Sequence, residues 1–184
     1  MKNIVLIGMP GSGKSTLGVV LAKYLNMAFC DTDLFIQQFE KRKLQEIINS
    51  EGVDGFLKKE EKYLLSFESE NMVIATGGSV VLSEKAMAHL KKNSTVIYLK
   101  VDFSNLTHRL KNRKTRGIAM DDGQTLKDIY EIRTPLYKKY ADVTILCDGN
   151  AYPQYQSAVI RAAKRFGVKR NRQNVDNDKK KEGL

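Results

Sequence analysis

Five short apolar runs recur along the chain, and each has the length of a buried β-strand. The run over residues 2–7 is rich in β-branched residues and lacks polar alternation, a pattern typical of a strand covered on both faces of its sheet. The predicted strands cover residues 2–7, 27–31, 72–76, 95–101 and 143–147.

Helical periodicity fills the segments between these runs. Leu17, Leu21 and Leu25 recur at the spacing of one helix face, and Asn26 is a plausible terminus. Gly52 and Gly55 interrupt a longer helical stretch, which predicts two helices that meet at a turn. The predicted helices cover residues 14–25, 43–67, 84–90, 103–110, 126–140 and 153–166, with Ser83 and Asp102 as N-caps.

This alternation of strand and helix predicts an α/β fold with a parallel sheet covered on both faces. A chain of 184 residues with 42% hydrophobic content suffices for one buried core, so we expect a single domain over residues 1–167. The polar, basic segment 168–184 is expected to be a disordered tail.

The formal net charge of +10 raises the possibility of a nucleic-acid partner. Much of the excess lies in the tail, a second basic group spans residues 109–116, and no nucleic-acid-binding signature accompanies either. We therefore expect a small-molecule substrate and no nucleic acid.

The chain shows neither a signal peptide near Met1 nor an apolar stretch of membrane-spanning length, so a cytoplasmic protein without a membrane partner is expected. Cys30 and Cys147 match no metal-binding spacing and are expected to be reduced, buried thiols. A monomer is the expected state.

Residues 8–15 read Gly-Met-Pro-Gly-Ser-Gly-Lys-Ser, a complete phosphate-binding loop between the first strand and the first helix. Its glycines let the backbone approach an anion, and its N–H groups and the helix N-terminus supply positive charge. Lys14 is predicted to reach the β- and γ-phosphates of ATP, and the Ser15 hydroxyl to bind Mg²⁺. The predicted nucleotide-binding residues are Gly11, Ser12, Gly13, Lys14, Ser15 and Thr16.

Two acids lie at the carboxyl end of the second predicted strand: Asp31 is its last residue, and Asp33 follows two positions later. In an open parallel sheet, ligands bind in the crevice at this end of the strands. Asp31 is predicted to hold a metal-bound water or to orient the acceptor, and Asp33 to accept hydrogen bonds from substrate hydroxyls. The alternative is that either acid caps the following helix.

Taken together, these motifs make the chain resemble the shikimate kinase family from about residue 3 to residue 147. The phosphate-binding loop and the Asp-x-Asp pair are joined by further matches: Ala75-Thr76-Gly77-Gly78, Gly52-x-x-Gly55-Phe56-x-x-x-Glu60, Arg116, Arg133-Thr134-Pro135-Leu136-Tyr137 and Tyr140-Ala141-Asp142-Val143-Thr144. The resemblance implies a three-layer P-loop kinase fold with a five-stranded parallel sheet. It also implies a substrate-binding helical region at residues 32–62 and a mobile lid at residues 111–123.

The resemblance also implies roles for individual residues. Asp33 would bind ring hydroxyls of the substrate, Gly77 and Gly78 would let the backbone approach it, and Arg133 would pair with its carboxylate. Arg116 would contact the nucleotide phosphates from the lid and complete the catalytic set of Lys14, Asp31, Asp33 and Arg116 on closure, which keeps water from the γ-phosphate.

Two departures fall among the substrate-binding positions. Leu57 replaces the family's arginine that binds the substrate carboxylate, and an aliphatic side chain cannot supply that bidentate contact. Ser79 replaces a third glycine and adds a hydroxyl beside the substrate. Glu60, the acid that would orient the missing arginine, is then expected to lie with Glu61 on a charged helix surface.

These observations predict an ATP-dependent phosphotransferase that acts on a hydroxyl of a small molecule. The first reading is a shikimate kinase whose carboxylate anchor is reduced to Arg133. The alternatives are a paralogue with another small hydroxyl acceptor and a non-catalytic nucleotide-binding protein.

We expect His108 to lie at the surface and Tyr137 in the core or on a helix face.

Overall fold

A computed structural model describes residues 2–111, 117–121, 123–148 and 152–165. The strands are β1 (Asn3–Ile7), β2 (Ala28–Asp31), β3 (Met72–Ala75), β4 (Ser94–Lys100) and β5 (Val143–Leu146). The helices are α1 (Lys14–Leu25), α2 (Thr32–Glu40), α3 (Leu44–Leu65), α4 (Glu84–Lys91), α5 (Phe103–Lys111), α6 (Leu126–Tyr140) and α7 (Tyr152–Arg165), with a 3₁₀ turn at Val80–Leu82.

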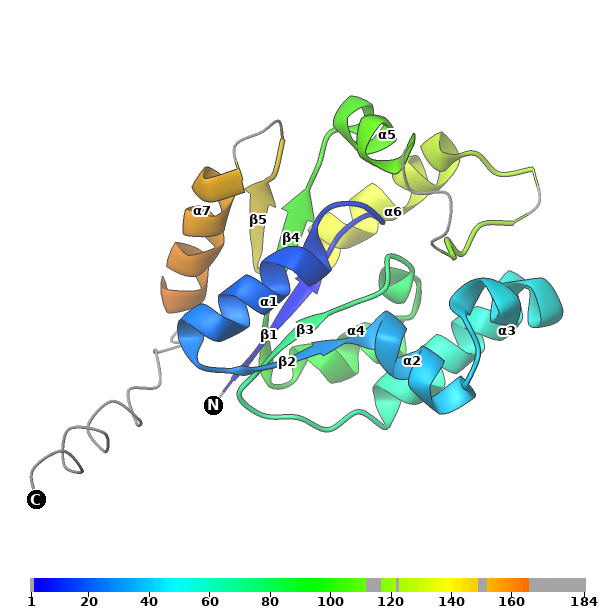
Figure 1. Cartoon of the computed structure of the whole chain (residues 1–184), viewed down its shortest axis with the longest axis horizontal. Coiled ribbons are helices and arrows are strands. Elements are labelled where there is room, and N and C mark those ends of the chain that lie inside the picture. The colour runs from blue at the N-terminus through cyan, green and yellow to red at the C-terminus, as the bar shows by residue number, and fades with distance from the viewer. Residues whose placement is uncertain (1, 112–116, 122, 149–151, 166–184) are drawn as a thin grey trace, which may run out of the picture.

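The five strands form one parallel sheet, as predicted, and the structure shows that their order is β2-β3-β1-β4-β5. All of β1 is buried because it lies between two other strands and under helices on both sides. In Figure 1, α1 and α7 lie on one face of the sheet, and α4 and α6 lie on the other. The predicted three-layer architecture is therefore confirmed.

A helical lobe built from α2 and α3 projects from the edge of the sheet (Figure 1). α2 lies in a segment to which the apolar periodicity assigns no element, although the family resemblance implies a helical region there. The predicted break in α3 is present at Gly52, whose φ of 73° and ψ of 175° lie outside the helical region. The lobe has a small apolar cluster of its own, made of Ile36, Leu44, Ile47, Ile48, Phe56 and Ala119.

Both cysteines are free, and Cys147 is buried as expected, whereas Cys30 is only half-buried. No described helix has the length and apolar character needed to cross a bilayer. The predicted tail at 168–184 lies outside the described residues.

An ionic cluster fastens α2 to α3. The Glu40 carboxylate accepts hydrogen bonds from Lys59 Nζ at 2.9 Å, Tyr63 Oη at 2.7 Å and Arg42 Nη2 at 3.0 Å, and its side chain is 11% exposed. The hydrogen bonds from Tyr63 and then Lys59 lower the pKa of Glu40 to about 2. The cluster fixes the end of α2 against the second half of α3.

We expect Glu40→Gln to destabilise the fold by about 1–3 kcal/mol at pH 7, because charge-assisted hydrogen bonds are lost. A carboxyl whose pKa is depressed on folding stabilises the protein above its unfolded pKa of about 4.3 and loses that contribution as the pH falls toward its folded pKa. Urea unfolding of the variant should therefore show a weaker loss of stability between about pH 5 and pH 2. Glu84→Gln, at an exposed ion pair with Lys139, is the control. An unchanged acid dependence in Glu40→Gln would contradict this role.

Candidate active site

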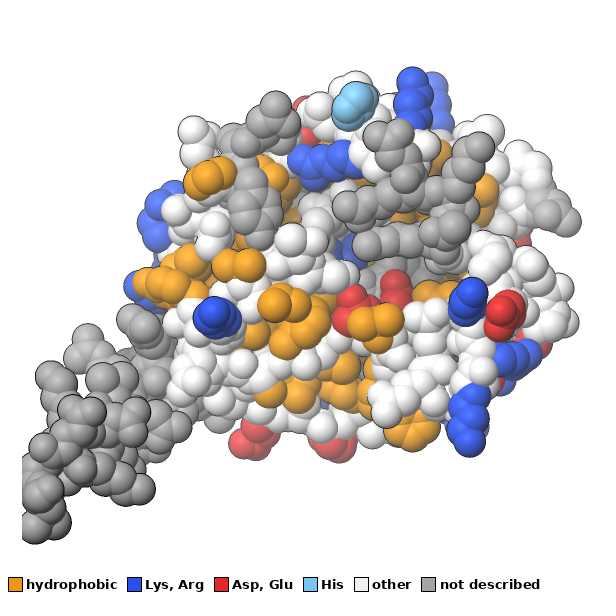
Figure 2. Space-filling model, in the orientation of Figure 1, with side chains coloured by type: hydrophobic (Ala, Val, Ile, Leu, Met, Phe, Trp, Pro, Cys, Tyr) orange, Lys and Arg blue, Asp and Glu red, His pale blue; other side chains and the backbone are white. Residues whose placement is uncertain are grey.

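One cavity of about 510 Å³ opens at the carboxyl ends of β1, β2 and β3. Figure 2 shows the hollow between the sheet and the helical lobe, with acidic side chains gathered beside it. Of the predicted site residues, those that line the cavity are Gly11, Ser12, Gly13, Lys14, Ser15, Thr16, Asp33, Gly78, Ser79 and Arg133. The fold thus brings ten positions, spread over more than 120 residues of sequence, around one space.

The phosphate-binding loop forms one wall. Gly11 and Gly13 have φ values of 81° and 97°, a region that side chains with a Cβ rarely adopt, and α1 begins directly after Gly13. Lys14 is 7% exposed, and its Nζ donates to the carbonyls of Gly8 at 2.7 Å and Met9 at 2.9 Å. The ammonium group therefore lies inside the loop at a helix N-terminus, which is the arrangement that binds phosphate.

The two acids after β2 have separate positions. Asp33 lines the cavity, whereas Asp31 is not one of the described residues that do. Asp31 Oδ1 accepts hydrogen bonds from the backbone N–H groups of Asp33 at 3.0 Å and Leu34 at 3.4 Å. The capping alternative is thus confirmed for Asp31, because the four N–H groups that begin a helix need acceptors.

The donor set fits Mg²⁺ that arrives with a nucleotide. Mg²⁺ keeps several waters and takes few protein ligands beside substrate phosphates. Ser15 supplies a hydroxyl at the cavity wall next to Lys14, and the described residues contain no cluster of three or more His, Cys, Asp or Glu side chains that would hold a metal alone.

The loop after β3 forms the opposite wall. Its Gly77 N–H donates to the buried Thr32 Oγ1 at 3.0 Å, which ties the loop to the start of α2. A Cβ on Gly77 would overlap Glu60 Oε1 and lie 2.7 Å from Asp33 Oδ1. Gly77 is not among the described cavity-lining residues, but the absence of its side chain lets two carboxyl groups approach beside the loop.

Glu60 is buried, so the expected surface position is wrong for this residue. Its side chain is 2% exposed, and its Oε2 accepts a hydrogen bond of 2.7 Å from the Ser79 hydroxyl. Burial, and secondly the nearby Asp33 charge, raises the pKa of Glu60 to about 8. The two departures from the family pattern therefore both concern Glu60. Leu57 replaces the arginine that Glu60 would orient, and Ser79 donates a hydrogen bond to Glu60 instead.

Leu57 is not among the residues that line the cavity, and its place among the substrate-binding positions stays a prediction. It packs against the apolar cluster of the helical lobe, together with Val53 and Tyr63. Packing of the aliphatic Leu57 side chain in this cluster removes apolar surface from water and so stabilises the fold.

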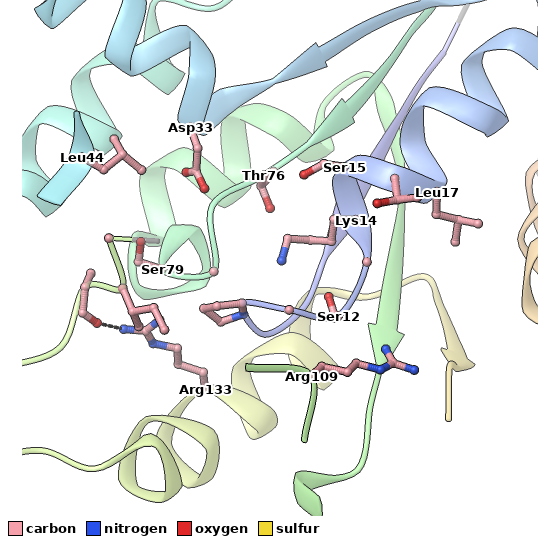
Figure 3. A pocket seen from close by; sticks show the side chains of 18 of the residues that line it. Ser12, Lys14, Ser15, Leu17, Asp33, Leu44, Thr76, Ser79, Arg109 and Arg133 are labelled. Atoms are coloured by element: carbon pink, nitrogen blue, oxygen red, sulfur yellow. Dashed lines mark hydrogen bonds between the residues drawn. The ribbon is translucent and has the colours of Figure 1, made fainter. Parts of the chain in front are cut away.

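Arg133 lines the cavity and is 3% exposed, and its pairing with a substrate carboxylate stays a prediction. Its Nη2 donates to the backbone carbonyl of Ala119 (Figure 3). Ala119 is itself 4% exposed, so this part of the predicted lid is packed against the helical lobe. Arg116 lies outside the described residues.

Sequence reasoning missed several residues of the cavity. Arg109 lines its nucleotide end and donates to the Cys147 carbonyl at 2.6 Å; its place in the basic group 109–116 was the available signal. His108 is exposed, as predicted, yet also borders the cavity. Phe56 and Thr76 contribute to the acceptor end, and both belong to motifs read from the sequence.

The fold and this cavity define a kinase of the P-loop class, with a phosphate-binding loop facing an acceptor region built from α2, α3 and the loop after β3. A family model described as "Shikimate kinase" matches residues 10–164. The chain belongs to the shikimate kinase family.

Individual relatives agree with this assignment. The shikimate kinase of Clostridium botulinum (strain Loch Maree / Type A3) is 37% identical over 170 residues, which cover 90% of this chain and 98% of that protein. A solved structure of the shikimate kinase of Acinetobacter baumannii in complex with shikimate has a TM-score of 0.80 at 28% identity and covers 92% of this chain and 96% of that one.

A second kind of relative is much longer than this chain. Threonine synthase-like 1 of Homo sapiens is 34% identical over 168 residues, which cover 90% of this chain. The chain spans only 23% of the length of that protein. In that relative the region similar to this chain is therefore one part of a larger polypeptide.

We expect Lys14→Ala to weaken Mg-ATP binding at least tenfold, because it removes the buried cation of the phosphate-binding loop. Calorimetric titration with Mg-ATP would measure the change. Lys23→Ala, an exposed lysine on the same helix, is the matched control and should bind like the unmodified chain. Equal affinities for the two variants would refute the nucleotide assignment.

Proposed function

We propose that the chain is an ATP-dependent kinase that transfers the γ-phosphate of ATP to a hydroxyl of shikimate. One observation carries the proposal: Lys14 of the phosphate-binding loop and Asp33 of the acceptor region line the same cavity, and Figure 3 shows them on either side of it. Membership of the family supports shikimate as the acceptor, as does the shikimate bound to the A. baumannii relative.

In this proposal the phosphate-binding loop positions the nucleotide. Lys14 and the N–H groups of the loop neutralise the β- and γ-phosphates. The Ser15 hydroxyl would hold Mg²⁺, which would supply positive charge against the negative charge that develops during transfer. Positioning and electrostatic stabilisation supply most of the rate enhancement in phosphoryl transfer.

Asp33 would orient the acceptor. Its carboxylate accepts a hydrogen bond from the attacking hydroxyl and can take the proton as the oxygen–phosphorus bond forms. Arg133 would contact the acceptor carboxylate. Arg116 would add positive charge from the lid, and lid closure would keep water away from the γ-phosphate.

We also propose that the protein acts in the cytoplasm as a monomer.

A second candidate is a family member that uses another small hydroxyl compound. It is favoured by Leu57, which packs into the helical lobe instead of offering a guanidinium to a carboxylate. Under the first candidate the same residue predicts weak affinity for shikimate.

The test is ADP release from Mg-ATP with and without saturating shikimate, with Lys14→Ala as the inactive control. Shikimate-dependent release by the unmodified chain would support the first candidate. Absence of release despite measurable ATP binding would support another acceptor or a purely nucleotide-binding role, and a screen of small hydroxyl compounds separates these two.

We expect Asp33→Ala to abolish transfer while ATP affinity changes less than about threefold, because Asp33 serves the acceptor and not the nucleotide. Leu57→Ala should hardly change ATP affinity. Single-turnover assays and ATP titrations on both variants would measure this. Normal turnover by Asp33→Ala would remove Asp33 from the acceptor site.

A further inference from the structure

The phosphate-binding loop and the loop after β3 (residues 76–79, the acceptor loop) touch each other in the wall of the cavity. Pro10 of the first loop and Gly78 of the second both line this wall. A Cβ on Gly78 would lie 2.6 Å from Pro10 Cδ and 2.8 Å from Pro10 Cγ, and the φ of Gly78 is not positive. Glycine therefore stands here because the two loops meet, and not because the backbone conformation requires it.

Two helices hold the acceptor loop in this place. The Gly77 N–H donates to Thr32 Oγ1 at 3.0 Å, at the start of α2. The Gly78 carbonyl accepts a hydrogen bond from Tyr137 Oη of α6. Each hydrogen bond fixes one peptide group of the loop, so α2 and α6 together set the position of Gly78 against Pro10.

Tyr137 also reaches the phosphate-binding loop. Its Oη lies 3.8 Å from Met9 Sδ, and the Met9 carbonyl accepts a hydrogen bond of 2.9 Å from Lys14 Nζ. Met9 is 2% exposed and Tyr137 is fully buried. One hydroxyl group thus contacts both the residue that holds the lysine of the phosphate-binding loop and the glycine of the acceptor loop.

Packing fixes the ring that carries this hydroxyl. Tyr137 stacks on Tyr98 of β4 with ring centroids 5.1 Å apart and an interplanar angle of 22°. Burial raises the pKa of the Tyr137 hydroxyl above its ordinary value, so the group stays protonated at neutral pH. It can therefore donate to Gly78 throughout the neutral range.

We propose that Tyr137 is a positioning residue for phosphoryl transfer, which holds Gly78 against Pro10 and so sets the separation between nucleotide and acceptor. This inference rests on the proposed function, since it concerns the geometry of the same transfer. A displacement of about 1 Å between reacting groups can lower a rate about 100-fold. Tyr137 is not among the described residues that line the cavity, so its effect should appear in the transfer step and not in binding.

Tyr137→Phe tests the proposal, because it removes only the hydroxyl. We expect kcat with shikimate to fall about tenfold, while the KM values for Mg-ATP and shikimate change less than about threefold. Tyr98→Phe removes a buried hydroxyl from the other ring of the stack and, as the matched control, should keep its kcat. An unchanged kcat in Tyr137→Phe, or an equal loss in both variants, would overturn the proposal.

A double variant tests whether Tyr137 acts through the contact of Gly78 with Pro10. Gly78→Ala forces the two loops apart, and we expect its kcat to fall about 100-fold. Adding Tyr137→Phe to Gly78→Ala should then cost less than about twofold more, because both changes release the same contact. Losses that multiply in the double variant would contradict this mechanism.

A measurement without turnover separates this inference from the proposed function. If the unmodified chain binds ATP but does not phosphorylate shikimate, the proposed function fails and the loop contact is still testable. In protein labelled with ¹³C-methyl methionine, the NMR signal of Met9, assigned with Met9→Leu, reports on the phosphate-binding loop next to Pro10.

We expect Gly78→Ala to shift the Met9 signal clearly more than Gly18→Ala does. Gly18→Ala is the matched control, since its Cβ would lie 2.6 Å from Phe29 Cε2 and so causes a similar overlap against a side chain of β2. A larger shift in Gly78→Ala would support the loop contact whether or not shikimate is the acceptor. Equal shifts in the two variants would overturn it.

Discussion

The parallel pairing of β1 with β3 is the constraint on which the site depends. Leu6 of β1 pairs with Ala75, the last residue of β3. Thr76, which follows β3, also bonds to β1: its N–H donates to the Leu6 carbonyl at 3.2 Å and its Oγ1 at 3.0 Å. Because both strands run in the same direction, the loops that follow them leave the sheet side by side. The phosphate-binding loop and the acceptor loop are therefore neighbours, and ligands bind where they diverge.

Helix α6 holds this arrangement from the side of the lid. Tyr137, which is buried as predicted, donates to the Gly78 carbonyl and stacks on Tyr98 with ring centroids 5.1 Å apart. One turn earlier, Arg133 holds the carbonyl of Ala119. One helix thus holds both the acceptor loop and a described segment of the predicted lid through hydrogen bonds.

The acceptor end differs from the nucleotide end in the balance of its charges. At the nucleotide end a buried lysine and a helix N-terminus offer positive charge to phosphates. At the acceptor end two carboxyl groups lie close together, and the protonated state of Glu60 relieves their repulsion. The departures at Leu57 and Ser79 both concern Glu60: Leu57 stands three positions before it in α3, and Ser79 donates a hydrogen bond to it.

The sequence by itself determined the layered fold and the place of the phosphate-binding loop between the first strand and the first helix. Apolar runs and helical spacing are local, and the loop motif is contiguous, so neither needs tertiary contacts to be recognised. α2 has only nine residues, and because so short a helix is marginal by itself, it depends on the Asp31 cap and on packing against α3. Only the tertiary structure decided that Asp31 caps a helix, that Leu57 packs against the apolar cluster of the helical lobe and that Glu60 is buried. Glu60 and Ser79 are 19 residues apart, and nothing local in the chain shows that one hydrogen bond joins them. Burial and long-range contacts, which set the charge and direction of these groups, arise only when the sheet and the helical lobe are assembled.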